Sequence, residues 1–223
     1  MTMDRELFLF PLNTVLLPGA MLQLHVFEDR YKTMMAQCMH DELPFGVLLE
    51  RAGRETGDAL DPVDVGTVAV IRQVTRLGAG RLFVIAQGTR RFRIDRVIGT
   101  TPFWRAQVTY LNEVDGPGDT DRLRQVATLR LRDYLDALLS PQGGGLEQIE
   151  LPDDAAASSY IIADALQVAT GVKQQLLEAG SATERLRAEV ALLNHEIRRL
   201  RNKAQPAGRS PATSEFPARF SLN

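Results

Sequence analysis

The sequence predicts an α+β protein in which a β-rich half precedes a helical half, and three observations support this. Up to about residue 111, short β-branched and aromatic runs are separated by Gly, Pro and Asn. After residue 118, apolar residues recur at helical spacing. Between the two, Asp115-Gly116-Pro117-Gly118 is a strong breaker. We therefore expect a β subdomain at residues 1–115, a helical subdomain at 116–203 and a flexible, Ala-, Pro- and Ser-rich tail at 204–223.

The runs in the first half predict seven strands with one helix inserted among them. The turn sequence Gly78-Ala79-Gly80 separates two of these runs by about the length of a hairpin. The inserted helix is expected at residues 28–39, where Tyr31, Met34, Met35 and Met39 recur at helical spacing. The predicted strands are residues 7–12, 21–26, 45–51, 66–75, 81–87, 90–97 and 103–111.

The second half predicts four helices, at residues 120–139, 152–169, 173–179 and from 181 onward. Ser181 and Glu184 form the S-x-x-E pattern of a capping box at the start of the last helix. The apolar seam of that helix lasts only about two heptads, which favours packing within the domain over a coiled coil. A monomer or a weak dimer is the expected state. The seam consists of Leu186, Val190, Leu193, Ile197 and Leu200.

Composition excludes several classes of protein. The 223 residues are 44% apolar, too many for a disordered chain, and no apolar run approaches the roughly 20 residues of a membrane span. Acidic residues and Pro11 and Pro18 break the pattern of a signal peptide near the N-terminus, and the single cysteine, Cys38, cannot form an internal disulfide. We expect a cytoplasmic protein with no membrane partner.

Motifs for catalysis are missing, so we expect a protein that is not an enzyme and needs no cofactor or metal. There is no G-x-x-x-x-G-K-[ST] loop for a nucleoside triphosphate and no G-x-S-x-G nucleophile elbow. Three lysines, placed in or beside helices, make a Ser-Lys pair hard to build. Cys38 and His40 supply two metal ligands where zinc needs three or four.

A basic segment lies between residues 64 and 105, where eight arginines and two aspartates give a local charge of +6. A solvated or internally paired face is the favoured reading, and a phosphate-contacting surface or a site for an acidic protein are alternatives. For the phosphate-contacting surface, the candidate nucleic-acid contacts are Arg72, Arg76, Arg90, Arg91 and Arg93.

Five motifs in a fixed order resemble the N-terminal, substrate-binding domain of Lon proteases. The first two are F-P-L-x-x-V-x-L-P-G and L-x-L-H-x-F-E-x-R-Y, which run from Phe10 to Tyr31. Phe45-Gly46-Val47, Gly66-Thr67-Val68-Ala69 and Gly88-Thr89-Arg90-Arg91-Phe92-Arg93-Ile94 follow in the β half. The likeness continues through the helical half, so that it covers about residues 7–201.

The resemblance implies a PUA-like β pseudobarrel followed by a helical subdomain. It also implies a stand-alone substrate-binding domain without the ATPase and peptidase modules of full-length Lon. Its expected partners are exposed apolar segments of unfolded or client proteins and peptides, together with an ATP-dependent protease.

We predict a shallow groove where the barrel meets the helices, with an apolar floor and a charged rim. The predicted floor residues are Phe10, Leu12, Phe27 and Tyr31, although each aromatic has an alternative place in the barrel core. The predicted rim residues are Glu28, Asp29 and Arg30.

Other functions stay open at this point. A PUA-like nucleic-acid-binding protein would use the basic segment, where the aromatic residues available for stacking are few. A small-molecule sensor would use the same groove, but no cluster of polar residues in the sequence indicates which ligand it would bind. A cryptic peptidase is the least supported alternative.

Overall fold

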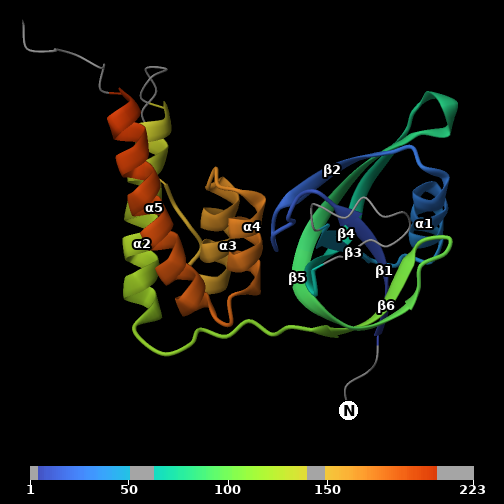
Figure 1. Cartoon of the computed structure of the whole chain (residues 1–223), viewed down its shortest axis with the longest axis horizontal. Helices are drawn as coiled ribbons and strands as arrows, with labels where there is room; N and C mark the ends of the chain where they lie inside the picture. Colours follow the sequence, from blue (N-terminus) through green and yellow to red (C-terminus); the bar gives the residue numbers. More distant parts are fainter. Residues whose placement is uncertain (1–4, 51–62, 140–148, 205–223) are drawn as a thin grey trace, which may run out of the picture.

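The computed structural model describes residues 5–50, 63–139 and 149–204, and the tail predicted at 204–223 lies outside these ranges except for its first residue. Six strands and one helix come first, and four helices follow (Figure 1). The strands are β1 (Arg5–Leu12), β2 (Met21–Val26), β3 (Phe45–Leu49), β4 (Val65–Arg76), β5 (Leu82–Gly99) and β6 (Trp104–Tyr110). The helices are α1 (Asp29–His40), α2 (Thr120–Leu139), α3 (Ala155–Ala165), α4 (Thr170–Glu178) and α5 (Ala182–Ala204).

The strands form one sheet that closes on itself, which confirms the predicted α+β pseudobarrel. The order is β2-β5-β4-β3-β1-β6, and a further pairing of β5 with β6 closes the ring (Figure 1). The pair β1–β3 is parallel, and the other pairs are antiparallel. Two expected strands, at 81–87 and 90–97, are one long strand, β5, whose register against β4 shifts at Val68/Ala69. This bulge lets β5 bend and take part in both sides of the ring.

Helix α1 packs against the barrel at the side that faces away from the other helices (Figure 1). Its buried residues are those of the helical pattern, with Cys38 in place of Met39. Tyr31, Met34 and Met35 join Phe45 in one apolar cluster. The inserted helix therefore completes the barrel core.

The helical half is arranged in two layers (Figure 1). Helices α3 and α4 lie next to the barrel, and the long helices α2 and α5 pack together on the outer side. The expected seam of α5 is used inside the molecule, since Leu186, Leu193 and Ile197 belong to the helical core cluster. Ser181 Oγ accepts a hydrogen bond from the Glu184 N–H at 3.2 Å, as the capping pattern predicts.

Barrel and helices share part of their core. Leu17 and Val65 of the β half belong to the same apolar cluster as the helices. The Gln174 side chain on α4 donates to the Val65 carbonyl at 2.9 Å. The boundary expected at residues 115/116 falls in the connection between β6 and α2. The two halves are thus packed against each other as well as joined by this connection.

Gly88 lies where β5 passes beneath the loop of residues 17–20, and this close approach requires glycine. The Gly88 N–H donates to the Ala20 carbonyl at 2.9 Å, while its own carbonyl accepts from Gly19 at 2.8 Å. A Cβ at this position would overlap the Leu17 carbonyl oxygen.

We expect Gly88→Ala to lower the free energy of unfolding by about 2–3 kcal/mol in urea denaturation, because the backbone at Leu17 or Gly88 would have to move. Gly78→Ala, where a Cβ meets nothing within 4 Å, is the matched control and should change it little.

Glu189 on α5 is fully buried, and its two carboxylate oxygens have no hydrogen-bond partner among the described residues. Burial raises the pKa of Glu189 well above its ordinary value, although the positive charge of Arg185 opposes this. The folded chain therefore holds this carboxyl in its neutral form. Because its folded pKa lies above the unfolded value of about 4.3, the free energy of unfolding is highest below pH 4.3 and falls as pH rises toward the folded pKa of Glu189.

We therefore expect Glu189→Met to raise the free energy of unfolding by about 1–3 kcal/mol, because an apolar side chain of similar volume removes two unsatisfied oxygens. The gain should be larger at pH 8 than at pH 5. Urea denaturation at the two pH values measures it. A gain that is equal at both values, or a loss, would show that this carboxyl is satisfied in the folded chain.

Candidate functional site

A cavity of about 410 Å³ lies between the barrel and the helical half. This volume is within the usual range for a ligand site. Its walls come from the loop of residues 18–20, from β5, from the connection after β6, and from one face of α3. The residues that matter below are Arg90 on β5, Glu113 in the connection, and Asp154, Ala157, Tyr160, Ile161 and Asp164 along α3. We call this cavity the junction groove.

Helix α3 forms one wall of the junction groove along its whole length. Asp154 is the N-cap, and its carboxylate accepts a hydrogen bond from the Ala157 N–H at 2.6 Å. Asp154, Ala157, Ile161 and Asp164 are spaced by three or four residues and so share one face. The 11 residues of α3 make a wall about 16 Å long. Ile161 is 43% exposed and gives this wall an accessible apolar side chain.

The position of α3 relative to the barrel depends on the carboxylate of Glu113. Oε1 accepts hydrogen bonds from Arg91 Nε at 2.7 Å and from the Tyr160 hydroxyl at 2.6 Å. Oε2 accepts from Arg185 at 3.3 Å. Arg91 belongs to β5, Tyr160 to α3 and Arg185 to α5. One carboxylate in the connection therefore ties the barrel to two helices, and we call this set the Glu113 clasp.

Two buried guanidinium groups share this single carboxylate, so other acceptors must satisfy them. Arg91 also donates to the carbonyls of Leu177 and Ala179, at 2.9 and 2.7 Å. Arg185 donates to the Leu176 carbonyl at 2.9 Å. These carbonyls lie at the C-terminal end of α4, where a helix has unpaired acceptors and partial negative charge. The end of α4 therefore provides the acceptors that Glu113 cannot supply.

The pKa values of Tyr160 and Glu113 are shifted in opposite directions. Burial raises the pKa of the Tyr160 hydroxyl, which stays protonated and able to donate. Burial would also raise the pKa of Glu113, but the Tyr160 hydrogen bond and the charges of Arg91 and Arg185 outweigh it, and the pKa lies below its ordinary value. The Arg185 guanidinium stacks 3.9 Å above the centre of the Tyr160 ring. Both titratable groups at the base of the groove are thus held in one protonation state.

The charged side chains at the edges of the groove differ in whether they have a partner. The Arg90 guanidinium lies 3.8 Å from the centre of the Tyr110 ring. One oxygen of Asp154 caps α3. The Asp164 side chain has no hydrogen bond or ion pair with any residue in the described ranges, although its main-chain carbonyl accepts from Lys173 at 2.9 Å. Asp164 is therefore a free acceptor at the end of the groove.

The predicted floor and rim residues lie elsewhere. Phe10 and Tyr31 are stacked at 4.1 Å inside the barrel core, next to α1, so their placement in a groove floor is corrected. Leu12 is half-buried beside the same cluster, and Phe27, which precedes α1, is 64% exposed. None of the four lines the junction groove. These positions follow from α1, which packs against the barrel on the side away from the other helices (Figure 1).

The three predicted rim residues are partnered locally at the start of α1. Glu28 and Arg30 form an ion pair at 2.6 Å, and Asp29 pairs with Lys32 at 2.9 Å. The side chain of Lys32 also lowers the pKa of Asp29 by a hydrogen bond and by its charge. These residues belong to the surface of α1 and not to the junction groove.

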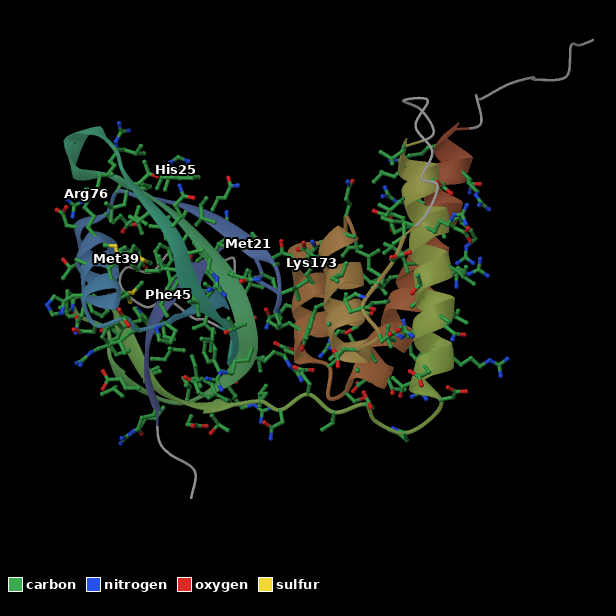
Figure 2. All side chains as sticks on the ribbon, turned by 180° about the vertical axis from the view of Figure 1, so that it is seen from behind. Met21, His25, Met39, Phe45, Arg76 and Lys173 are labelled. Atoms are coloured by element: carbon green, nitrogen blue, oxygen red, sulfur yellow. The ribbon has the colours of Figure 1, made fainter. Side chains whose placement is uncertain are left out.

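The candidate nucleic-acid contacts do not gather on one surface. Arg76 lies at the far end of the barrel, as Figure 2 shows, whereas Arg90 lines the junction groove. Arg76 pairs in register with Leu82, so about eight residues of strand, or about 26 Å, separate it from Arg90. Arg72 bonds to the Gln87 side chain at 2.8 Å, and Arg93 is exposed.

Arg91 requires a correction, because only 2% of it is exposed. Alternation along β5 turns it into the junction between the two halves, where it belongs to the Glu113 clasp. It cannot contact a nucleic acid from this position.

Metal binding, cysteine chemistry and membrane spanning are three other possibilities for the part of the chain that the structure describes. No group of three or more His, Cys, Asp or Glu side chains is placed to hold a metal ion within residues 5–50, 63–139 and 149–204. Cys38 is buried, and burial raises the pKa of its thiol to about 11. Among the same residues, no helix is long and apolar enough to cross a membrane.

A closed ring of strands, an inserted helix and a helical half define the class of protein, since solved Lon N-terminal domains have this fold. A Lon N-terminal domain protein from Xanthomonas campestris aligns with a TM-score of 0.63 and 28% identity, over 84% of this chain and 98% of that one. The N-terminal domain of a Mycobacterium avium complex Lon protease, at 20% identity and a TM-score of 0.60, shows the same fold.

Residues 6–195 match the family described as the ATP-dependent protease La (LON) substrate-binding domain, and the chain belongs to this family. It is 30% identical over 210 residues to a Lon protease of Paraburkholderia phytofirmans and 26% identical over 200 residues to one of Anaeromyxobacter dehalogenans. Each alignment covers 87% of this chain but only 26% and 24% of those proteases. The chain thus spans about a quarter of their length.

We expect Glu113→Gln to lower the free energy of unfolding by about 3 kcal/mol at pH 7, because two buried guanidinium groups lose their counter-charge. Since the pKa of Glu113 is lowered on folding, its contribution is present above about pH 4.3 and is lost as pH falls through the folded pKa. The difference between variant and parent should therefore shrink in urea denaturation at pH 3.

The control is Glu6→Gln, which removes an exposed ion pair with Arg105 at 3.2 Å. This change should cost less than about 1 kcal/mol. Equal losses in the two variants would mean that the Glu113 clasp contributes no more than a surface pair.

Proposed function

We propose that this chain is a non-catalytic binding module that holds exposed apolar segments of unfolded or client proteins in the junction groove. The observation that carries the proposal is an open groove with an accessible apolar wall, Ile161 and Ala157 of α3 facing Pro18 and Ala20. A wall about 16 Å long matches about five residues of extended chain at 3.3 Å each. Membership of a family described as substrate-binding supports the same assignment.

The proposal assigns no chemical step to the groove. Glu113 and Tyr160, the titratable groups at its base, are engaged with Arg91 and Arg185 and with each other. They are therefore positioned to hold the two halves together and not to exchange protons with a bound chain. Because the family is named for an ATP-dependent protease, we also propose that captured segments are passed to such a protease.

Nucleic-acid binding has less support than protein binding. The candidate arginines are spread along β4 and β5, and Arg91 is buried. A steep loss of RNA or DNA binding with salt would favour this alternative. Absence of binding at low salt would remove it.

We expect Ile161→Asp to weaken binding of an unfolded model protein, reduced and carboxymethylated α-lactalbumin, at least tenfold. A charge in the apolar wall opposes burial of an apolar side chain there. Fluorescence anisotropy with the labelled model protein measures the dissociation constant.

Leu129→Asp is the matched control, since Leu129 is 62% exposed on α2 and does not line the groove. It should leave the dissociation constant within about twofold, as should the combined change of Glu28, Asp29 and Arg30 to alanine. If Leu129→Asp or the triple variant weakens binding as much as Ile161→Asp, the groove is not the site. If the parent protein does not bind, the proposed function is wrong.

A further inference from the structure

Strand β2 has one side on which none of the described strands pairs with it. Among the described strands it pairs only with β5, and it stands at the end of the sheet order. It is six residues long, and Met21, Gln23 and His25 alternate as exposed residues with more buried neighbours. β2 is therefore an edge strand at the surface of the barrel.

The backbone groups that face this free edge follow from the register. Gly88 donates to the Ala20 carbonyl, so residue 20 is turned toward β5. In an antiparallel pair, every second residue directs its N–H and C=O to the same side, so residues 22, 24 and 26 also face β5. The N–H and C=O groups of Met21, Gln23 and His25 consequently point to the free edge. Three donor–acceptor pairs are presented there in the spacing of a β-ladder.

This free edge leads into the junction groove. Residues 18–20 line the groove, and Met21, which is 55% exposed, follows directly as the first residue of β2. Figure 2 shows Met21 on the side of the barrel that faces Lys173 of α4, while His25 lies toward the far end. Asp164, whose carbonyl accepts from Lys173 and whose carboxylate has no partner among the described residues, also lines the groove. A chain that leaves the edge at Met21 thus enters a groove with an apolar wall and a free acceptor.

We infer that a client segment binds as an added strand on the free edge of β2 and continues into the junction groove, where a lysine or arginine side chain pairs with Asp164. The inference rests on the proposed function and specifies its binding mode. The edge groups of Met21, Gln23 and His25 are complementary to an extended backbone, and the Asp164 carboxylate is complementary to a cationic side chain.

This binding mode suits an unfolded chain. Main-chain hydrogen bonds are available from every sequence other than proline, so the edge supplies affinity with little sequence preference. The Asp164 carboxylate then selects among extended segments by charge. The groove wall, with Ile161, adds an apolar contact.

Peptides with blocked edges provide the direct test. The probe is a fluorescein-labelled peptide of three Val-Thr repeats followed by Phe-Lys, and binding is followed by anisotropy. Two further versions carry backbone N-methyl groups on the valines or on the threonines. We expect one methylated version to bind at least tenfold more weakly and the other to stay within threefold of the unmodified probe, because only one edge of an added strand faces β2.

The protein side is tested with two changes at Gln23, whose N–H faces the free edge. Gln23→Pro removes this donor without removing a hydrogen bond to β5, and we expect at least a fivefold loss of affinity. Gln23→Ala removes only the side chain and should cost less than twofold. Asp164→Asn should weaken the Lys probe at least fivefold and leave a norleucine version of it unchanged.

The outcomes separate the two proposals. Equal binding of both methylated peptides, or no effect of Gln23→Pro, overturns strand addition, as does a parent protein that fails to bind the unmodified probe. The proposed function survives each of these results if unfolded α-lactalbumin still binds in a manner sensitive to Ile161→Asp. Loss of that binding removes the proposed function instead.

Discussion

The carboxylate of Glu113 is the group on which the arrangement of the two halves depends. It lies in an exposed connection, yet its two oxygens accept from Arg91 of the barrel and from Tyr160 and Arg185 of the helices. Both guanidinium groups are buried, and hydrogen bonds between charged groups are short and directional, so these contacts constrain how the helices lie against the barrel. The junction groove exists because this arrangement leaves α3 beside the loop of residues 18–20 without closing on it.

Two glutamates, Glu113 in the connection after β6 and Glu189 on α5, show how surroundings decide the protonation state of the same side chain. Glu113 meets a hydroxyl and two guanidinium groups, and these keep it charged despite its partial burial. Glu189 is buried more deeply, and Arg185, the cation that acts on it, has its hydrogen bonds directed to Leu176, Ser159 and Glu113. Its neutral form is therefore favoured. The charge of Glu113 is thus stabilised by its partners, whereas the burial of Glu189 costs free energy.

The sequence predicted the fold well because the fold is encoded in local patterns. Helical spacing located α1 and the seam of α5, and the breaker at residues 115–118 lies in the connection between the halves. The groove was harder to predict, since its wall is a face of α3 set against a loop more than 130 residues earlier in the chain. Tyr160 and Ile161 are adjacent apolar positions of one helix, and helical spacing alone does not separate the buried Tyr160 from the exposed Ile161. Arg91 looked like part of a basic surface, and only the register of β5 shows that it turns inward.

An open sheet edge is normally a hazard, because unpaired N–H and C=O groups recruit strands from other chains. Natural sheets shorten such edges, and β2 is short, with polar Gln23 and His25 beside its exposed Met21. In this fold the ring of β1, β3, β4, β5 and β6 is already closed by the β5–β6 pairing, so β2 lies outside the closure. β2 pairs with residues 82–87 of β5, which β6 does not reach, and its other side takes no part in the ring. β2 thus satisfies part of β5 on one side and, on the other, leaves a short edge whose first residue adjoins the groove, which is the feature that the proposed strand addition uses.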